Sequence, residues 1–235
     1  MLIGSLEKFT LIDYPGKLAA TVFCSGCNFK CPWCYNSEIV LPENIKKQSA
    51  ISEEELEFFL KDRKEFLEGV CVCGGEPTTY PDLPDFLQKI KKIGYLVKLD
   101  TNGSNPEMLR SLIKGGLVDY VAMDIKAPKE KYHEVIGKQK NMEDLLFRIE
   151  ASINCLKEDK VDYEFRTTVV PILLHKEDIL KIARWISPSK KYFLQNFQAK
   201  KTVDSHFEGL KPYPEDYLIE IKQAIEPFFE VCQVR

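Results

Sequence analysis

The chain has 235 residues, 44% of them hydrophobic and 29% charged, with a formal net charge of −3 at pH 7. Its lysines and arginines are scattered among carboxylates, so we expect no nucleic-acid partner. No apolar run approaches the roughly 20 residues that span a bilayer, and the first residues lack a secretion signal, so we expect no membrane partner and a cytoplasmic location. A length of about 200 to 250 residues is common for a single α/β barrel, and we predict one domain over residues 1–235.

From Leu18 onward, short β-branched runs alternate with longer segments of helical period. The pattern predicts strands at 18–23, 69–73, 95–99, 118–125, 162–170 and 192–197. It predicts a helix that opens with a capping box at Ser52–Glu55, and further helices at 83–93, 106–114, 142–156, 176–185 and 214–228, before a short tail. Right-handed crossovers would bury all six strands in one parallel sheet. The predicted fold is therefore α/β, a partial (βα)6 barrel of the TIM type.

Three cysteines, Cys27, Cys31 and Cys34, lie in the loop at about 24–38 that follows the first predicted strand. Thiolates on one loop indicate an iron-sulfur cluster, and three ligands would leave one iron of a four-iron cluster open to a small molecule. Cys24 adds a second alternative, a zinc site, because the segment then contains two CxxC pairs. Zinc ribbons, however, usually separate such pairs by about 12 to 20 residues. A third alternative is a set of unligated thiols. We expect Cys24 to be a buried thiol at the strand end.

Polar motifs follow the next strands of the predicted barrel, at the carboxyl ends where such folds place their active sites. They are Gly74-Gly75-Glu76-Pro77, Asp100-Thr101-Asn102-Gly103, Asp124-Ile125-Lys126 and Arg166. Gly74 and Gly75 suit a place where backbone approaches a ligand closely, because glycine has no Cβ. Taken alone, each glycine or aspartate motif is also ordinary turn chemistry. Their gathering at one face predicts a site that includes the cysteine loop.

With these motifs, the chain resembles the radical S-adenosylmethionine (SAM) superfamily. Within it the chain looks most like the glycyl-radical-enzyme activases, especially the activating proteins of anaerobic ribonucleoside-triphosphate reductase. The resemblance extends over residues 5–16, the cysteine motif, and the runs 74–77, 100–103 and 123–126. It implies a radical SAM core with a [4Fe-4S] cluster on Cys27, Cys31 and Cys34, whose fourth iron binds SAM.

The resemblance also implies which residues surround SAM. Trp33, Tyr35 and Asn36 would lie near the adenine, and the run Gly74, Gly75, Glu76 and Pro77 would hold the methionine amino group, unless Glu76 orders the loop instead. The remaining SAM-site residues would be Asp100, Thr101, Asn102, Asp124 and Lys126, some of which would also bind a monovalent cation. Arg166 would hold the SAM ribose or carboxylate, or pair with Asp124 or Glu164, because an arginine inside an apolar strand is rarely left unpaired.

The implied activity is cleavage of SAM to a 5′-deoxyadenosyl radical that abstracts hydrogen from a glycine of a partner glycyl radical enzyme. The leading partner is anaerobic ribonucleoside-triphosphate reductase, and the electron donor would be a low-potential protein such as flavodoxin or ferredoxin. Residues 37–52 contain no further cysteine, which suits the simpler activases. Asp13 resembles a substrate-contacting position or begins a proline turn, and Gln195–Gln198 could add an adenosine contact. His206 is only a loose match to a SAM-contacting histidine. The rival functions are a radical SAM enzyme acting on a small molecule and a zinc-stabilised binding module.

Overall fold

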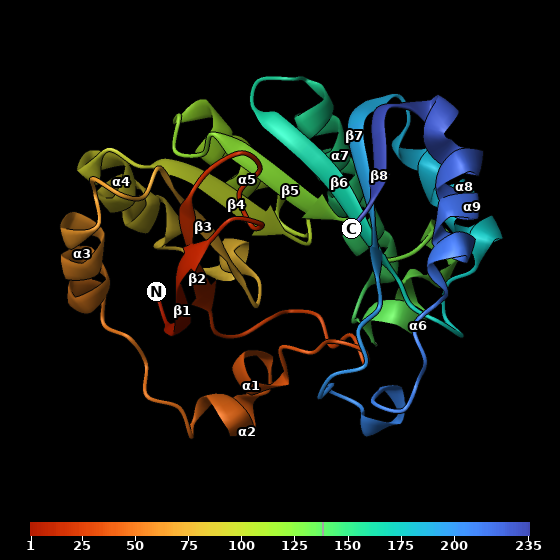
Figure 1. Cartoon of the computed structure of the whole chain (residues 1–235), viewed down its shortest axis with the longest axis horizontal. Coiled ribbons are helices and arrows are strands. Elements are labelled where there is room, and N and C mark those ends of the chain that lie inside the picture. Colours follow the sequence, from red (N-terminus) through yellow and green to blue (C-terminus); the bar gives the residue numbers. More distant parts are fainter. Residues whose placement is uncertain (138) are drawn as a thin grey trace.

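The computed structural model describes residues 1–137 and 139–235, and its strands form an eight-stranded sheet in chain order (Figure 1). The strands are β1 (Ile3–Thr10), β2 (Ala19–Cys24), β3 (Gly69–Gly74), β4 (Leu96–Thr101), β5 (Tyr120–Asp124), β6 (Asp162–Val169), β7 (Ser189–Asn196) and β8 (Phe229–Val234). Every neighbouring pair from β2 to β8 is parallel, whereas β1 runs antiparallel to β2. The sheet is therefore a curved, open α/β barrel with β1 and β8 at its two edges.

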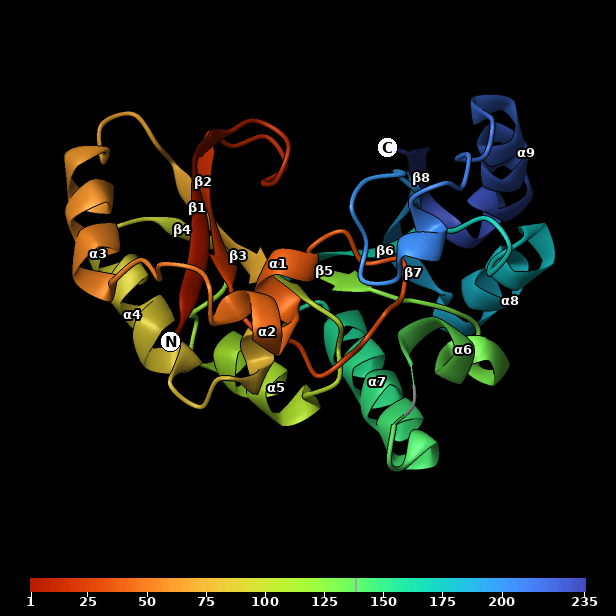
Figure 2. The ribbon, with the colours of Figure 1, turned by 90° about the horizontal axis from the view of Figure 1, so that it is seen from below.

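Helices cover the outer face of this sheet, as Figures 1 and 2 show. They are α3 (Glu53–Asp62), α4 (Leu83–Ile93), α5 (Pro106–Lys114), α7 (Met142–Lys157), α8 (Lys176–Ile186) and α9 (Glu215–Ile225). The short α6 (Tyr132–Ile136) lies nearer the cysteine loop, where the carbonyl of Ile136 accepts a hydrogen bond from the amide of Lys30 at 2.9 Å. The short helices α1 (Ser37–Val40) and α2 (Pro42–Ile45) instead lie over the carboxyl ends of the strands, on the face seen in Figure 2. Within the described part of the chain, no helix is both long enough and apolar enough to cross a membrane.

The residues that start and end the helices act as the sequence predicts. Ser52 Oγ accepts a hydrogen bond from the amide of Glu55 at 3.1 Å, and the Glu55 carboxylate accepts one from the amide of Ser52 at 2.8 Å. This reciprocal capping box starts α3. Gly94 ends α4 with a φ of +99°, a left-handed conformation that glycine adopts at little cost.

Alternate strand residues face two different environments, because successive side chains of a strand point to opposite faces. Val70, Val72, Val97, Leu99 and Val121 are fully buried beneath the helices. The opposite, concave face carries the polar side chains that fill the barrel. The apolar layer fixes the register of each strand, and the register fixes which polar groups meet inside.

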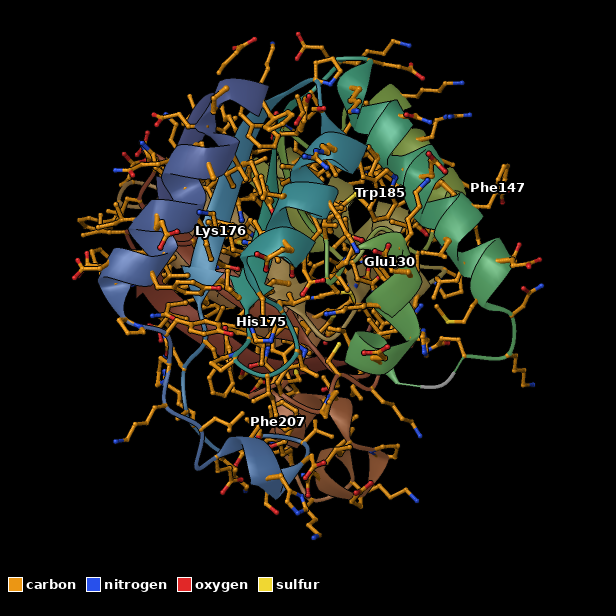
Figure 3. The ribbon with its side chains drawn as sticks, turned by 90° about the vertical axis from the view of Figure 1, so that its right-hand side faces the viewer. Glu130, Phe147, His175, Lys176, Trp185 and Phe207 are labelled. Atoms are coloured by element: carbon orange, nitrogen blue, oxygen red, sulfur yellow. The ribbon has the colours of Figure 1, made fainter. Side chains whose placement is uncertain are left out.

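Figure 3 views the side of the molecule formed by α7, α8 and α9. Trp185 of α8 lies on this side. The ring of Tyr132 packs edge-on against Trp185, with ring centroids 6.1 Å apart. Glu130, just before α6, pairs with Lys181 of α8 at 2.6 Å. These contacts fix the long connection after β5 against the barrel wall.

The prediction of six strands was incomplete, because β1 and β8 add one strand at each edge. In β1 most residues are exposed or half-buried, so its sequence lacks the apolar run that marked the interior strands. Residues 229–234 were expected to be a tail, but they pair in parallel with β7. The organisation of residues 1–235 as one domain stays a prediction.

Candidate active site at the carboxyl ends of the strands

A cavity lies at the carboxyl ends of the strands. It is lined by every predicted site residue except Pro77: Cys27, Cys31, Trp33, Cys34, Tyr35, Asn36, Gly74, Gly75, Glu76, Asp100, Thr101, Asn102, Asp124, Lys126 and Arg166. Pro77 instead begins the short 3₁₀ helix η1 (Pro77–Thr79) behind the cavity wall. Sequence reasoning missed Phe23, Phe29, Val40, Cys73 and Thr168, which also line the cavity. These residues belong to ordinary apolar or β-branched stretches, and only the fold shows that they face inward.

The cysteine loop is held in place by hydrogen bonds from two directions. Asn28 donates to Ser104 Oγ at 2.8 Å, and its side-chain oxygen accepts from Asn102 at 2.9 Å. The strap, residues 197–214 between β7 and α9, approaches from the other side, and Figure 1 shows it beside the cysteine loop. Its amides at Val203 and Asp204 donate to the carbonyls of Cys34 and Pro32, each at 2.9 Å. The loop is thus positioned by both the DTNG loop and the strap.

Burial favours the protonated form of the three loop thiols, whereas the charge of Lys126 opposes this effect. Burial raises the pKa of both Cys27 and Cys31 to about 12, and it raises the pKa of Cys34 as well. Among residues 1–137 and 139–235, no three His, Cys, Asp or Glu side chains surround a point where one metal ion would bind. A four-iron cluster makes a different demand, since each cysteine binds a separate iron. Cys27, Cys31 and Cys34 all line the same cavity, as a cluster held by three cysteines requires.

Cys24 differs from the other three cysteines in where its side chain lies. It is the last residue of β2, it is fully buried, and it is absent from the cavity wall. The expectation of a buried thiol at the strand end is confirmed. The zinc alternative needed Cys24 as a fourth ligand, and its position disfavours that alternative.

The structure gives Gly74 and Gly75 a role that the sequence did not indicate. A Cβ on Gly75 would lie 1.7 Å from the carbonyl oxygen of Gly26, and a Cβ on Gly74 would lie 2.6 Å from the backbone of Cys24. The end of β3 therefore approaches the backbone before the cysteine loop closely, and the approach of a ligand to these two glycines stays a prediction. Two bonds seal this contact, from the Gly75 amide to Cys24 and from the Glu76 amide to Gly26, at 2.8 and 2.9 Å.

Glu76 joins two of the loops that carry the site. Its buried carboxylate accepts hydrogen bonds from the amide of Thr78 at 3.1 Å, from Thr101 Oγ1 at 2.7 Å and from the amide of Asn102 at 2.6 Å. Burial raises the pKa of Glu76, and these donors partly oppose that effect. The contacts show that Glu76 orders the GGEP and DTNG loops.

Charged side chains alternate in sign across β4, β5 and β6. Arg166 bridges two aspartates, with Nη1 2.8 Å from Asp100 Oδ2 and Nε 2.8 Å from Asp124 Oδ1. Lys126 Nζ lies 2.9 Å from Asp124 Oδ2, and Lys98 pairs with Asp100 Oδ1. Burial alone would raise the pKa of both aspartates, but the neighbouring cations outweigh burial and hold the pKa of each below its ordinary value. We refer to these five groups as the charge ladder.

The contacts in the charge ladder show which carboxylates pair with Arg166, and they include a residue that was not predicted, Lys98. Arg166 pairs with Asp124, as one alternative proposed, and with Asp100 in addition. It does not use Glu164, which instead binds Arg235 at 3.0 Å and accepts from Tyr120 at 2.9 Å. Lys98 was not predicted, because a lysine in a strand is normally exposed.

Known proteins of similar sequence identify the family to which this chain belongs. The sequence model of the Radical SAM superfamily matches residues 21–186, which is more than half of the chain. The chain belongs to this superfamily. Its members use a [4Fe-4S] cluster together with SAM. This membership places the chain among enzymes and disfavours the zinc-stabilised binding module.

Individual relatives of this radical SAM chain differ in what they are named for. A Methanocaldococcus jannaschii protein, named provisionally as a glycyl-radical enzyme activating enzyme, is 32% identical over 237 residues and covers 100% of this chain and 95% of its own length. A 7-carboxy-7-deazaguanine synthase of Aquifex aeolicus is 32% identical over 108 residues, which are 44% of this chain and 46% of that protein. A radical SAM methyltransferase from Sphaerobacter thermophilus has a TM-score of 0.71 and 13% identity, over 94% of this chain and 67% of that one. The last comparison supports the fold alone.

Features of the cavity suit the cofactors that the superfamily uses. Trp33 Nε1 is buried and has no hydrogen-bond partner among the residues that the structure describes. A buried donor without a partner is costly unless a ligand accepts from it. Lys126 Nζ lies 5.2 Å from the Trp33 ring centroid and close to the loop thiols, where its charge favours thiolates. The donor set thus fits an electron-rich cluster and a polar ligand beside it.

Other candidate residues vary in their relation to the cavity. Asp13 and Gln195 both line it. Asp13 accepts a hydrogen bond from Thr21 Oγ1 at 2.6 Å, which holds its carboxylate inside the barrel. The His206 side chain is 90% exposed and bonds to Asp204 at 2.7 Å, so the structure gives it no place in the cavity.

Proposed function

We propose that the protein is a SAM-dependent activase that abstracts hydrogen from a glycine of a partner glycyl radical enzyme. The leading partner is anaerobic ribonucleoside-triphosphate reductase. The observation that carries the proposal is the 32% identity to the provisionally named activating enzyme of M. jannaschii, which extends over 100% of this chain. The lack of cysteines between Ser37 and Ser52 supports a simple, single-cluster activase.

In this proposal Cys27, Cys31 and Cys34 hold the [4Fe-4S] cluster. When bound and reduced, the cluster supplies the electron that cleaves SAM to methionine and a 5′-deoxyadenosyl radical. The protein keeps that chemistry away from water with Phe29 and Trp33, which are 4% and 5% exposed. The electron would come from flavodoxin or ferredoxin at the outer side of the cysteine loop, where Lys30 is exposed.

The rest of the cavity would hold SAM. The backbone of Gly74–Glu76 supplies polar groups for the methionine amino group, while Arg166 and Lys126 offer cationic donors to its carboxylate or ribose. Trp33, Tyr35, Asn36 and Gln195 would contact the adenosine. Thr101 and Asn102 would act mainly through Glu76, since both bond to it.

Asp13 is the residue that we assign to the partner protein. It reaches the cavity from the loop between β1 and β2, and Thr21 fixes its orientation. A carboxylate there would accept hydrogen bonds from the backbone of a glycine-containing segment that enters through the open side of the barrel.

The test is anaerobic incubation of reconstituted, reduced protein with SAM and candidate glycyl radical enzymes, monitored by electron paramagnetic resonance. The expected result is the doublet of a glycine-centred radical with the reductase. Deoxyadenosine formation without a doublet in any partner would refute the activase function. Partner protein whose glycine is replaced by alanine is the matched control.

A radical SAM enzyme acting on a small molecule is the second candidate. The similarity to 7-carboxy-7-deazaguanine synthase over 44% of this chain is the observation that favours it. Deoxyadenosine release that rises with an added nucleoside precursor, but not with partner protein, would support this alternative.

A further inference from the structure

Lys98 occupies an unusual place for a lysine. It lies in the middle of β4, opposite Cys71 of β3 and Tyr120 of β5, and its side chain is only 1% exposed. Charged groups are almost never buried so completely unless they are paired. The Lys98 ammonium pairs with Asp100 Oδ1 and lies 3.8 Å from Cys71 Sγ. It is therefore an internal charge directed at the aspartate of the DTNG run.

The carboxylates of the charge ladder are fully engaged by protein cations. Asp100 uses one oxygen for Lys98 and the other for Arg166, at 2.8 Å in the second case. Asp124 uses one oxygen for Arg166 and the other for Lys126, at 2.8 and 2.9 Å. In the ladder, the three cations outnumber the two carboxylates.

This arrangement does not fit the monovalent cation that the family resemblance implied at these positions. Hard cations bind through oxygen ligands, above all carboxylates and carbonyls. Every carboxylate oxygen of Asp100 and Asp124 already faces a lysine or an arginine, so an inorganic ion would add a fourth positive charge beside only two carboxylates. The Lys98 ammonium is itself a compact point charge with three donors, comparable to a small cation.

We propose that Lys98 replaces an inorganic monovalent cation: its tethered ammonium supplies the positive charge at Asp100, so that this chain binds SAM without a requirement for potassium or sodium. The inference rests on the proposed SAM site. Lys98 acts through Asp100 and Arg166, so it is a positioning residue. The tether also supplies the charge at any salt composition, because it cannot dissociate.

The experiment measures SAM dissociation constants by equilibrium dialysis with anaerobically reconstituted protein in KCl, NaCl or choline chloride at one ionic strength. For the wild type we expect the three constants to agree within about twofold. Lys98→Ala leaves the space of the ammonium empty, and we expect about tenfold weaker SAM binding in choline chloride. This loss is smaller than the full cost of removing one partner of a buried ion pair, because Asp100 keeps its pairing with Arg166. Potassium should restore most of that loss, because the ion can then reach Asp100 Oδ1.

Two further variants separate charge from packing. Lys98→Met fills the space of the lysine without a charge. The affinity of this variant for SAM should therefore fall, and potassium should restore less of the lost affinity than it does in Lys98→Ala. Lys91→Ala is the matched control, because Lys91 also pairs with an aspartate, Asp119 at 2.7 Å, but on the outer side of the barrel. It should show the wild-type affinity for SAM in all three salts.

Thermal unfolding gives a readout that needs neither the cluster nor SAM. The unfolding temperature of iron-free Lys98→Ala should be higher in KCl than in choline chloride, while that of the wild type should be the same in both salts.

Each outcome bears on the inference. Tenfold tighter SAM binding by the wild type in KCl than in choline chloride would overturn it, as would folded Lys98→Ala that potassium does not rescue. If Lys98→Ala fails to fold, the wild-type salt series still decides. Wild type that binds no SAM in any salt would refute the proposed function and this inference together, whereas salt-dependent binding would refute the inference alone.

Discussion

Replacement of Arg166 by methionine tests whether the charge ladder stabilises the fold. The change removes two charge-assisted hydrogen bonds of 2.8 Å while keeping a side chain of similar reach. Such bonds contribute about 1.5 to 3 kcal/mol each, and removal of one partner from a buried ion pair costs about 3 to 5 kcal/mol. Because Asp100 and Asp124 each retain a lysine, we expect a loss of about 3 to 5 kcal/mol in the free energy of unfolding.

Urea unfolding of the iron-free protein, followed by circular dichroism, measures this loss. Arg148→Met is the matched control, since Arg148 forms an exposed pair with Asp144 one helical turn away, at 2.6 Å. Exposed pairs of this kind contribute about 0.3 to 0.5 kcal/mol, so the control should lose no more than that. If Arg166→Met lost less than about 1 kcal/mol, the view that Arg166 balances two buried carboxylates would be wrong.

Gly75→Ala should reduce both stability and iron content, because its Cβ would lie 1.7 Å from the Gly26 carbonyl, while Gly209→Ala, with no atom within 4 Å of the new Cβ, should leave both unchanged. Iron analysis after anaerobic reconstitution should find normal iron in Cys24→Ala and little in Cys27→Ala; equal loss in both would restore Cys24 as a ligand. Burial raises the pKa of Cys27 from 9.0 to about 12, so folding favours its protonated form. The contribution of the Cys27 thiol to the free energy of unfolding is fully present below about pH 9, and it falls by about 1.4 kcal/mol per pH unit between about pH 9 and pH 12. Iron-free Cys27→Ala should therefore lose less stability than wild type from pH 9 to 11, and parallel curves would contradict the assignment.

Much of the interior of the fold was predictable because it depends on local signals. Ser52 and Glu55 form a capping box whatever surrounds them, and Gly94 ends α4 through its own backbone freedom. The edge strands escaped prediction because their pairing depends on a neighbour. β1 is held by its antiparallel register with β2, and β8 by its parallel register with β7.

The cavity was predictable as a set of strand ends, but the partners within it were not. The sequence places Asp100, Asp124 and Arg166 at the right edge of the sheet, because parallel strands end together. It cannot show that Arg166 bridges both aspartates while Glu164 turns to Arg235, since the latter contact joins residues 71 positions apart. Lys98 could have been found by noting that it lies two positions before Asp100, on the same face of the strand.

Hydrogen exchange in the strap can be used to follow the position of the cysteine loop. The amides of Val203 and Asp204 are occupied by the carbonyls of Cys34 and Pro32, at the other end of the sequence. Any event that displaces the cysteine loop must therefore break these two bonds and let both amides exchange with deuterium. Exchange protection at two positions late in the chain would thus report the state of a loop near its start.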